Sequence, residues 1–128
     1  MAFRLINATE ARTGTVIMIE KEACIVKSTD TSKTGKHGHA KVRIEAIGIF
    51  DDKKRVFVVP GHERFEVPMI NKLKGQVLGI QEKASIMDLE SFETIEVMVP
   101  ENIKDELKEG DNIEYWDVEG KKIIKRKL

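Results

Sequence analysis

A strict alternation of apolar and charged residues runs through Ala40-Lys41-Val42-Arg43-Ile44-Glu45-Ala46. Successive side chains of a β-strand point to opposite faces of its sheet. A period of two therefore predicts a half-buried strand, with one face against a core and the other in solvent.

Further short runs of β-forming residues flank this strand. Upstream, residues 15–19 and 22–27 are rich in Val, Ile and Thr, and Glu20-Lys21 between them predicts a turn. Downstream, residues 55–59 form another run that ends at Pro60-Gly61. Many short strands separated by turn residues are typical of small barrels and sandwiches, so we expect an all-β fold.

The second half of the chain continues this pattern and adds one helix. Residues 94–99 alternate again, with Ile and Val on one face. Residues 113–118 and 121–127 flank Glu119-Gly120, which predicts a β-hairpin. Residues 101–108 fit one short helix, because a proline precedes them and a glycine follows.

Charge divides the chain of 128 residues into two halves, although the formal net charge is zero. Residues 1–70 hold 12 Lys/Arg and 9 Asp/Glu, whereas residues 71–128 hold 10 and 13. The change falls near Val67-Pro68, where proline favours an extended backbone and a short linker. A chain of this length often forms one domain, but we expect two, over residues 1–69 and 70–128.

Composition excludes several classes of protein. The single cysteine, Cys24, cannot close a disulfide within the chain or build a cysteine-based zinc site, and it indicates a reducing compartment. No apolar run approaches the ~18 residues of a membrane helix, and no signal-peptide core is present at the N-terminus. We therefore expect a cytoplasmic protein with no membrane partner.

The segment 28–39 carries the most information about function. It holds Ser, Thr, Asp, Gly, Lys and His and no large apolar residue, which predicts a solvent-facing loop. Its 12 residues exceed the usual hairpin connection, and long loops are often functional. Gly35 and Gly38 bracket Lys36 and His37, and they permit a tight, bare tip.

Two interpretations of this loop are not supported by its residues. Gly35-Lys36 matches only part of the phosphate-binding pattern G-x-x-x-x-G-K-[ST], because Asp30 replaces the first glycine and His37 the final Ser/Thr. His37 and His39 lack the further ligands that zinc needs. We therefore expect neither a nucleotide-dependent enzyme nor a metal site.

The remaining hypothesis is that the tip of this loop contacts a polyanion or is covalently modified. From Lys27 to Arg43 the chain holds five Lys/Arg and one acid, which concentrates positive potential at one end of a neutral protein. Lysine is also a frequent target of modification.

The run Ser32-Lys33-Thr34-Gly35-Lys36-His37-Gly38-His39-Ala40-Lys41 resembles the hypusine loop of translation factor 5A, the archaeal and eukaryotic relative of bacterial elongation factor P. The resemblance continues to Val67-Pro68 and, more loosely, over the whole chain, and it is greatest to the archaeal form. It implies an SH3-like β-barrel over residues 1–69 that carries the modified loop 28–39. It also implies a C-terminal OB-fold barrel over residues 70–128.

The resemblance implies that Lys36 is the modified residue. In the family, deoxyhypusine synthase transfers an aminobutyl group from spermidine to this lysine and uses NAD, and the product is deoxyhypusine or hypusine. The NAD belongs to that enzyme, so no cofactor is expected in this chain. Recognition of the loop is then expected from its neighbours Lys33, Thr34, Gly35, His37, Gly38, His39 and Lys41.

The resemblance further implies a non-enzymatic factor that works on the ribosome. The family binds near the acceptor end of the peptidyl-tRNA and promotes peptide bond formation, especially at stalled sequences, by positioning that end. The alternative is an unmodified RNA-binding module built from the same two barrels. A monomer is expected. The candidates for RNA phosphate contact are Lys27, Lys33, His37, His39, Lys41 and Arg43.

The C-terminal half is less suited to RNA. Residues 100–119 hold 8 acids and 2 lysines, and the half contains few aromatic residues. Tyr115 and Trp116 are expected in the core or at an interface rather than as base-stacking residues. Residues 121–127 hold five basic residues that suit RNA contact, and the alternative there is a charged edge strand that opposes aggregation.

Overall fold

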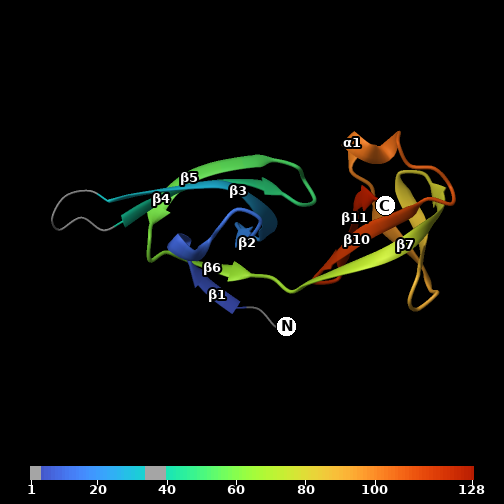
Figure 1. Ribbon diagram of the computed structural model, residues 1–128, viewed down its shortest axis with the longest axis horizontal. Coiled ribbons are helices and arrows are strands. Elements are labelled where there is room, and N and C mark those ends of the chain that lie inside the picture. Colours follow the sequence, from blue (N-terminus) through green and yellow to red (C-terminus); the bar gives the residue numbers. More distant parts are fainter. Residues whose placement is uncertain (1–3, 34–39) are drawn as a thin grey trace. The chain divides into compact units, whose positions relative to one another are not determined.

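The computed structural model describes residues 4–33 and 40–128, and nearly every regular element in it is a β-strand (Figure 1). The all-β fold class is confirmed. The chain divides into two compact units, Met1–Met69 and Ile70–Leu128. Each unit has its own core and is described by itself.

The N-terminal unit contains two antiparallel sheets that together form the SH3-like barrel. One sheet has four strands in chain order, and the other has two. Their bounds are β2 (Val16–Ile19), β3 (Glu22–Lys33), β4 (Ala40–Gly48) and β5 (Lys54–Pro60) for the first, and β1 (Arg4–Asn7) and β6 (Arg64–Val67) for the second. A single 3-10 turn, η1 (Ala8–Glu10), follows β1.

The alternation predicted for residues 40–46 is confirmed in β4. The side chains of Val42, Ile44 and Ala46 are fully buried, whereas Lys41 and Arg43 are exposed. Burial of each branched aliphatic side chain stabilises the fold by roughly 1.5–3 kcal/mol. The same core cluster also contains Ile6, Ala8, Ala11, Ile17, Cys24 and Val26.

The C-terminal unit is a closed five-stranded barrel, as in an OB-fold. The strands follow one another around the barrel in the order β10-β11-β9-β8-β7. Their bounds are β7 (Ile70–Ile80), β8 (Lys83–Asp88), β9 (Thr94–Met98), β10 (Asn112–Val118) and β11 (Lys121–Lys127). Between β6 and β7 only Pro68 and Met69 remain outside a strand.

The helix predicted over residues 101–108 is shorter in the structure, where α1 spans Glu101–Lys104. Beyond it, the backbone N–H groups of Glu106 and Leu107 donate to carbonyls three residues earlier, which is the tighter 3-10 pattern. Leu107 is buried in the barrel core, so the chain leaves the helix where this side chain must turn inward.

The hairpin predicted at Glu119-Gly120 is confirmed, and both residues have positive φ, at 50° and 97°. Two positive φ values are typical of the turn that matches the twist of paired strands. The alternative that residues 121–127 form a protective edge strand is wrong, because β11 lies between β10 and β9 in the closed barrel. No helix in the described part of the chain has the length and apolar composition to cross a membrane.

Candidate functional site

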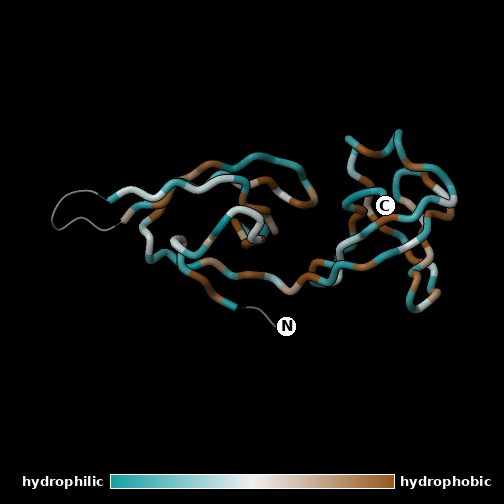
Figure 2. The backbone as a smooth tube through the Cα atoms, viewed as in Figure 1, coloured by the Kyte–Doolittle hydropathy of each residue, from teal (hydrophilic) through white to brown (hydrophobic). Residues whose placement is uncertain are grey.

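The β3–β4 hairpin frames the segment that the sequence singled out. The strands pair antiparallel as far as Lys33 opposite Ala40, so residues 28–33, predicted as loop, are strand instead (Figure 1). The ladder of backbone hydrogen bonds to β4 holds this polar segment extended although most of its side chains are exposed. Figure 2 shows the hydrophilic character of this outer part. Six predicted site residues lie outside the described residues: Thr34, Gly35, Lys36, His37, Gly38 and His39.

The register sorts the remaining site residues onto two faces of the hairpin. Cross-strand partners share a face, so Lys41 lies with Ser32, and Arg43 lies with Asp30. Lys33, the residue after Ser32 in β3, pairs with Ala40. Because successive side chains of a strand alternate, Lys33 lies on the face opposite to Ser32 and Lys41. The structure brings Lys41 and Arg43 together but places Lys33 on the other side of the sheet.

Lys27 occupies a β-bulge. The pairing of β3 with β4 shifts between Val26 and Ser28, and Lys27 is the extra residue. A bulge commonly redirects a side chain and twists its strand. The Lys27 side chain is exposed, and its carbonyl accepts a hydrogen bond from the Thr13 hydroxyl at 3.5 Å.

Arg43 forms an ion pair with Glu45 that was not predicted from the sequence. Its Nη2 lies 2.9 Å from Glu45 Oε1, and the Ser28 hydroxyl donates to Glu45 Oε2 at 3.1 Å. The hydrogen bond from Arg43, and then that from Ser28, hold the pKa of Glu45 below its ordinary value. Within the described residues, the amines of Lys27, Lys33 and Lys41 form no ion pair with a carboxylate. The i,i+2 spacing of Arg43 and Glu45 in a strand was the signal that could have revealed this pair.

At the far end of the hairpin, an ion pair joins Asp51 in the β4–β5 connection to Arg55 on β5. Arg55 donates to both carboxylate oxygens of Asp51, at 3.2 and 2.8 Å. This bond lowers the pKa of Asp51 to about 2. Gly48 lies directly beside the pair, and the nearby thiol of Cys24 is fully buried, which raises its pKa.

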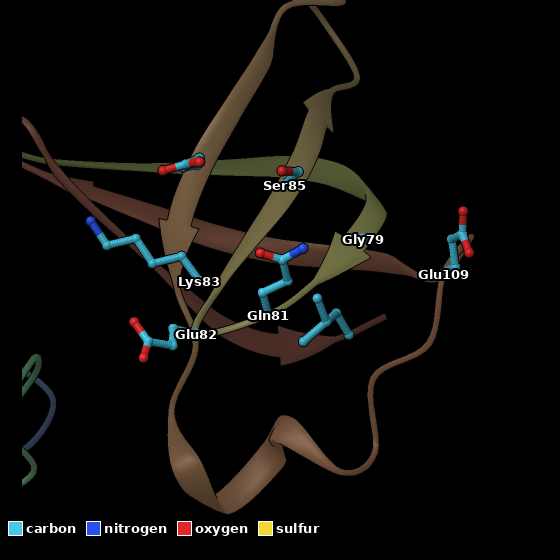
Figure 3. A pocket seen from close by; sticks show the side chains of 8 residues that line it. Gly79, Gln81, Glu82, Lys83, Ser85 and Glu109 are labelled. Carbon is cyan, nitrogen blue, oxygen red and sulfur yellow. The ribbon is translucent and has the colours of Figure 1, made fainter.

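In the C-terminal unit, a groove beside the β7–β8 connection is acidic (Figure 3). Its charged lining consists of Glu82, Lys83, Glu96 and Glu109, and Figure 3 places Glu109 across the groove from Glu82 and Lys83. An OB-fold commonly binds oligonucleotides over its second and third strands and its first loop, which here are β8, β9 and this connection. Three carboxylates disfavour RNA phosphates in this groove.

Three of the five basic residues of β11 form ion pairs with carboxylates on β10 or directly before it. Ion pairs join Lys122 to Asp117 at 3.9 Å, Arg126 to Glu114 at 3.1 Å and Lys127 to Asp111 at 3.5 Å. These contacts reduce the positive potential that the five basic residues suggested in the sequence.

Trp116 is half-buried, and two lysines cover its ring. The Lys72 and Lys125 ammonium groups lie 4.7 and 4.9 Å from the ring centroid, a cation–π arrangement. The indole N–H donates to Glu114 Oε1 at 2.9 Å. The ring is thus partly covered by side chains of its own barrel and is not an open platform for a base.

Tyr115 is buried, as the sequence predicted, and its hydroxyl donates to the Asp88 carboxylate inside the barrel. Asp88 is the one buried charged residue in the described part of the chain. The bond from Tyr115, and then those from backbone N–H groups, hold the pKa of Asp88 below its ordinary value. Burial, together with this bond, raises the pKa of Tyr115.

No group of three or more His, Cys, Asp or Glu side chains within residues 4–33 and 40–128 is placed to hold a metal ion. The described part of the candidate site is the β3–β4 hairpin with its exposed lysines Lys27, Lys33 and Lys41.

Comparison with known protein families places the chain in a known group. Residues 4–62 match the family described as "Translation initiation factor 5A-like, N-terminal". A translation initiation factor 5A from Methanosphaera stadtmanae is 41% identical over 127 residues, covering 98% of this chain and 96% of that protein. One from Thermofilum pendens is 43% identical over 129 residues and covers 98% of both.

Solved structures agree with these sequence matches. The "Eukaryotic translation initiation factor 5A from Methanococcus jannaschii" superposes with a TM-score of 0.86 at 38% identity, over 98% of this chain and 95% of that one. A protein of the same factor family from Naegleria fowleri superposes with a TM-score of 0.79 at 28% identity, over 99% of both chains.

Proposed function

This chain belongs to the translation initiation factor 5A family and is a translation factor, and from this we propose that it acts on the ribosome through a hypusine or deoxyhypusine at Lys36. In this proposal the chain is not itself an enzyme. It binds near the acceptor end of the peptidyl-tRNA and promotes peptide bond formation, especially at stalled sequences.

The observation that carries the proposal is the paired stem of the β3–β4 hairpin. The ladder continues to Lys33 and Ala40, so Lys36 is in the six-residue connection between two strand ends. The five residue steps from Ser28 to Lys33 correspond to roughly 17 Å of extended strand. A stem of this length can carry one side chain into the pocket of a modifying enzyme and later into a narrow site on RNA.

The covalent step is a group transfer. The C–N bond between the aminobutyl group and the secondary nitrogen of spermidine breaks, and a C–N bond to the Lys36 amine forms. A proton from the lysine amine ends on the diamine that leaves. Deoxyhypusine synthase performs this step and holds the NAD, and the chain supplies only the acceptor amine. The product side chain is longer and carries two amines.

On the ribosome the modified side chain would act by positioning. Holding the acceptor end in a reactive geometry lowers the entropic part of the barrier without acid–base chemistry. The exposed amines of Lys27, Lys33 and Lys41 are available for phosphate contact on both faces of the stem.

The first test is the mass of the protein isolated from growing cells, with the peptide spanning Lys36 fragmented. We expect one aminobutyl group on Lys36, with or without one oxygen. Lys36→Arg keeps the charge and removes the acceptor amine, so this variant is expected to lose activity on stalled messages in a purified translation assay. An unmodified Lys36, or full activity of Lys36→Arg, would favour the unmodified RNA-binding module.

A further inference from the structure

Phe92, in the connection between β8 and β9, presents its side chain to solvent. The residue is 69% exposed, the highest value among the large hydrophobic residues in the described part of the chain. Leu89, at the start of the same connection, is 37% exposed. We call residues 89–93 the Phe92 loop.

The Phe92 loop is held to the barrel by the side chain and the backbone of one residue, Asp88. Asp88 Oδ1 accepts hydrogen bonds from the N–H groups of Glu90 and Ser91, both at 2.8 Å. The Asp88 carbonyl accepts from the N–H of Phe92 at 2.8 Å, and the Asp88 N–H donates to the carbonyl of Glu93 at 2.9 Å. The other Asp88 oxygen accepts from the buried hydroxyl of Tyr115. The loop is thereby tied to the barrel core.

The backbone of Phe92 lies in the left-handed region, with φ at 60°. This conformation favours glycine or asparagine and is uncommon and strained for a bulky residue. Strain of this kind tends to occur at ligand clamps and binding sites. A phenylalanine that is 69% exposed gains little from burial within the barrel to offset this strain.

An exposed aromatic ring on a fixed loop is a typical anchor of a protein interface, because little conformational freedom is lost on binding. The ring is flanked by Glu90 and Glu93, which are both exposed. The complementary surface is an apolar pocket bordered by Lys or Arg side chains. We propose that the Phe92 loop docks into such a pocket on a basic protein of the ribosome.

A protein fits this loop better than RNA does. A ring can stack on a base, but two glutamates beside it would face phosphates, and the charge opposes that contact. This inference rests on the ribosome binding proposed above, and it concerns the C-terminal unit, whereas the Lys36 proposal concerns the β3–β4 hairpin.

The test measures binding of the full chain to purified archaeal ribosomes, with every variant in the same Lys36 state. Phe92→Asn removes the ring at a position where asparagine is tolerated, so its melting temperature is expected to be unchanged or higher. Its affinity is expected to fall at least about fivefold, while Phe92→Tyr stays close to the parent protein. Leu78→Thr is the matched control, since Leu78 is 39% exposed on β7, outside the loop.

Two further measurements identify the partner. Glu90→Lys and Glu93→Lys are expected to weaken binding to a basic protein surface and would tighten binding to RNA. Replacement of Phe92 by photoreactive benzoylphenylalanine is expected to crosslink to a ribosomal protein. Crosslinks to ribosomal RNA, together with tighter binding of the lysine variants, would overturn the inference in favour of an RNA contact.

The outcomes separate this inference from the proposed function. Parent affinity in Phe92→Asn would overturn the docking inference and leave ribosome binding standing. A parent chain that does not bind ribosomes at all would overturn the proposed function, and the docking inference with it.

Discussion

Arg43 and Glu45, two positions apart on β4, form an ion pair on the outer face of the hairpin, with 2.9 Å between Nη2 and Oε1. The pair divides the basic residues of the hairpin into two kinds. Arg43 has a carboxylate partner, whereas the neighbouring Lys41 forms no ion pair within the described residues. Lysines of this second kind are the stronger candidates for phosphate contact.

We expect the two kinds to differ in the salt dependence of ribosome binding. Lys41→Gln should reduce the slope of log affinity against log salt by about 0.7–0.9, the change for one phosphate contact. The double variant Arg43→Gln with Glu45→Gln removes a pair of zero net charge and should leave the slope nearly unchanged. An equal change in both variants would contradict this assignment.

Gly48→Ala is expected to destabilise the N-terminal unit. A Cβ at this position would lie 1.8 Å from Asp51 Oδ1 and 2.9 Å from Arg55 Nη1, so the ion pair must shift. We expect a loss of about 1–3 kcal/mol of unfolding free energy, measured by thermal or urea denaturation. The control is Gly79→Ala, where nothing lies within 4 Å of an added Cβ. A control that loses as much would refute the steric explanation.

Asp88 should make the C-terminal unit sensitive to acid. Its pKa is lower in the folded state, because the hydroxyl of Tyr115 and backbone N–H groups donate to its carboxylate. Its contribution is therefore fully present above the unfolded pKa, near 4, and is lost as the pH falls through the folded pKa. Asp88→Asn should therefore weaken the fall in the unfolding free energy that the parent protein shows as the pH drops below about 4. A variant profile as steep as the parent profile would exclude Asp88 as the source.

Tyr115 should make the stability of the C-terminal unit depend on pH in the alkaline range. Burial raises its pKa in the folded state, so its contribution is present below the unfolded pKa, about 10, and falls as the pH rises above it. Tyr115→Phe should cost about 1.5–3 kcal/mol at neutral pH, because the Asp88 carboxylate loses a buried donor. The difference between the parent and Tyr115→Phe should shrink above about pH 10. A difference that is constant with pH would show that ionisation of Tyr115 has no part in it.

Trp116 is not expected to report on RNA. Lys72 and Lys125 cover its ring, and Glu114 accepts its N–H. Addition of single-stranded RNA to the isolated chain should leave its fluorescence unchanged, while Lys72→Ala, which removes one of the two ammonium groups from the ring, should alter the emission without RNA. Quenching of the parent protein by RNA would identify the ring as a stacking surface.

Local pattern predicted most of the fold, and it failed where tertiary contacts decide the structure. Alternation in β4 and the Glu119-Gly120 turn are properties of adjacent residues, and both were visible in the sequence. Residues 28–33 are polar on both faces, so no periodicity could reveal that β4 holds them as strand. The predicted helix over residues 101–108 was too long, because the burial of Leu107 interrupts it.

Less of the candidate site than of the fold could be predicted from the sequence. The bulge at Lys27 changes the register, so counting along the chain could not assign the lysines of β3 to a face. The bond between Asp88 and Tyr115 joins residues 27 positions apart, a separation at which no local pattern applies. Composition indicated a basic hairpin correctly, but it could not show that Glu45 balances Arg43.

The chain holds one cysteine and one tryptophan, and they lie in different units: Cys24 in the N-terminal unit and Trp116 in the C-terminal one. The thiol is fully buried, so alkylating reagents reach it only when its barrel opens. The emission of the half-buried indole responds to the opening of the other barrel. Each barrel therefore contains its own native reporter, and the unfolding of the two can be followed separately without adding a label.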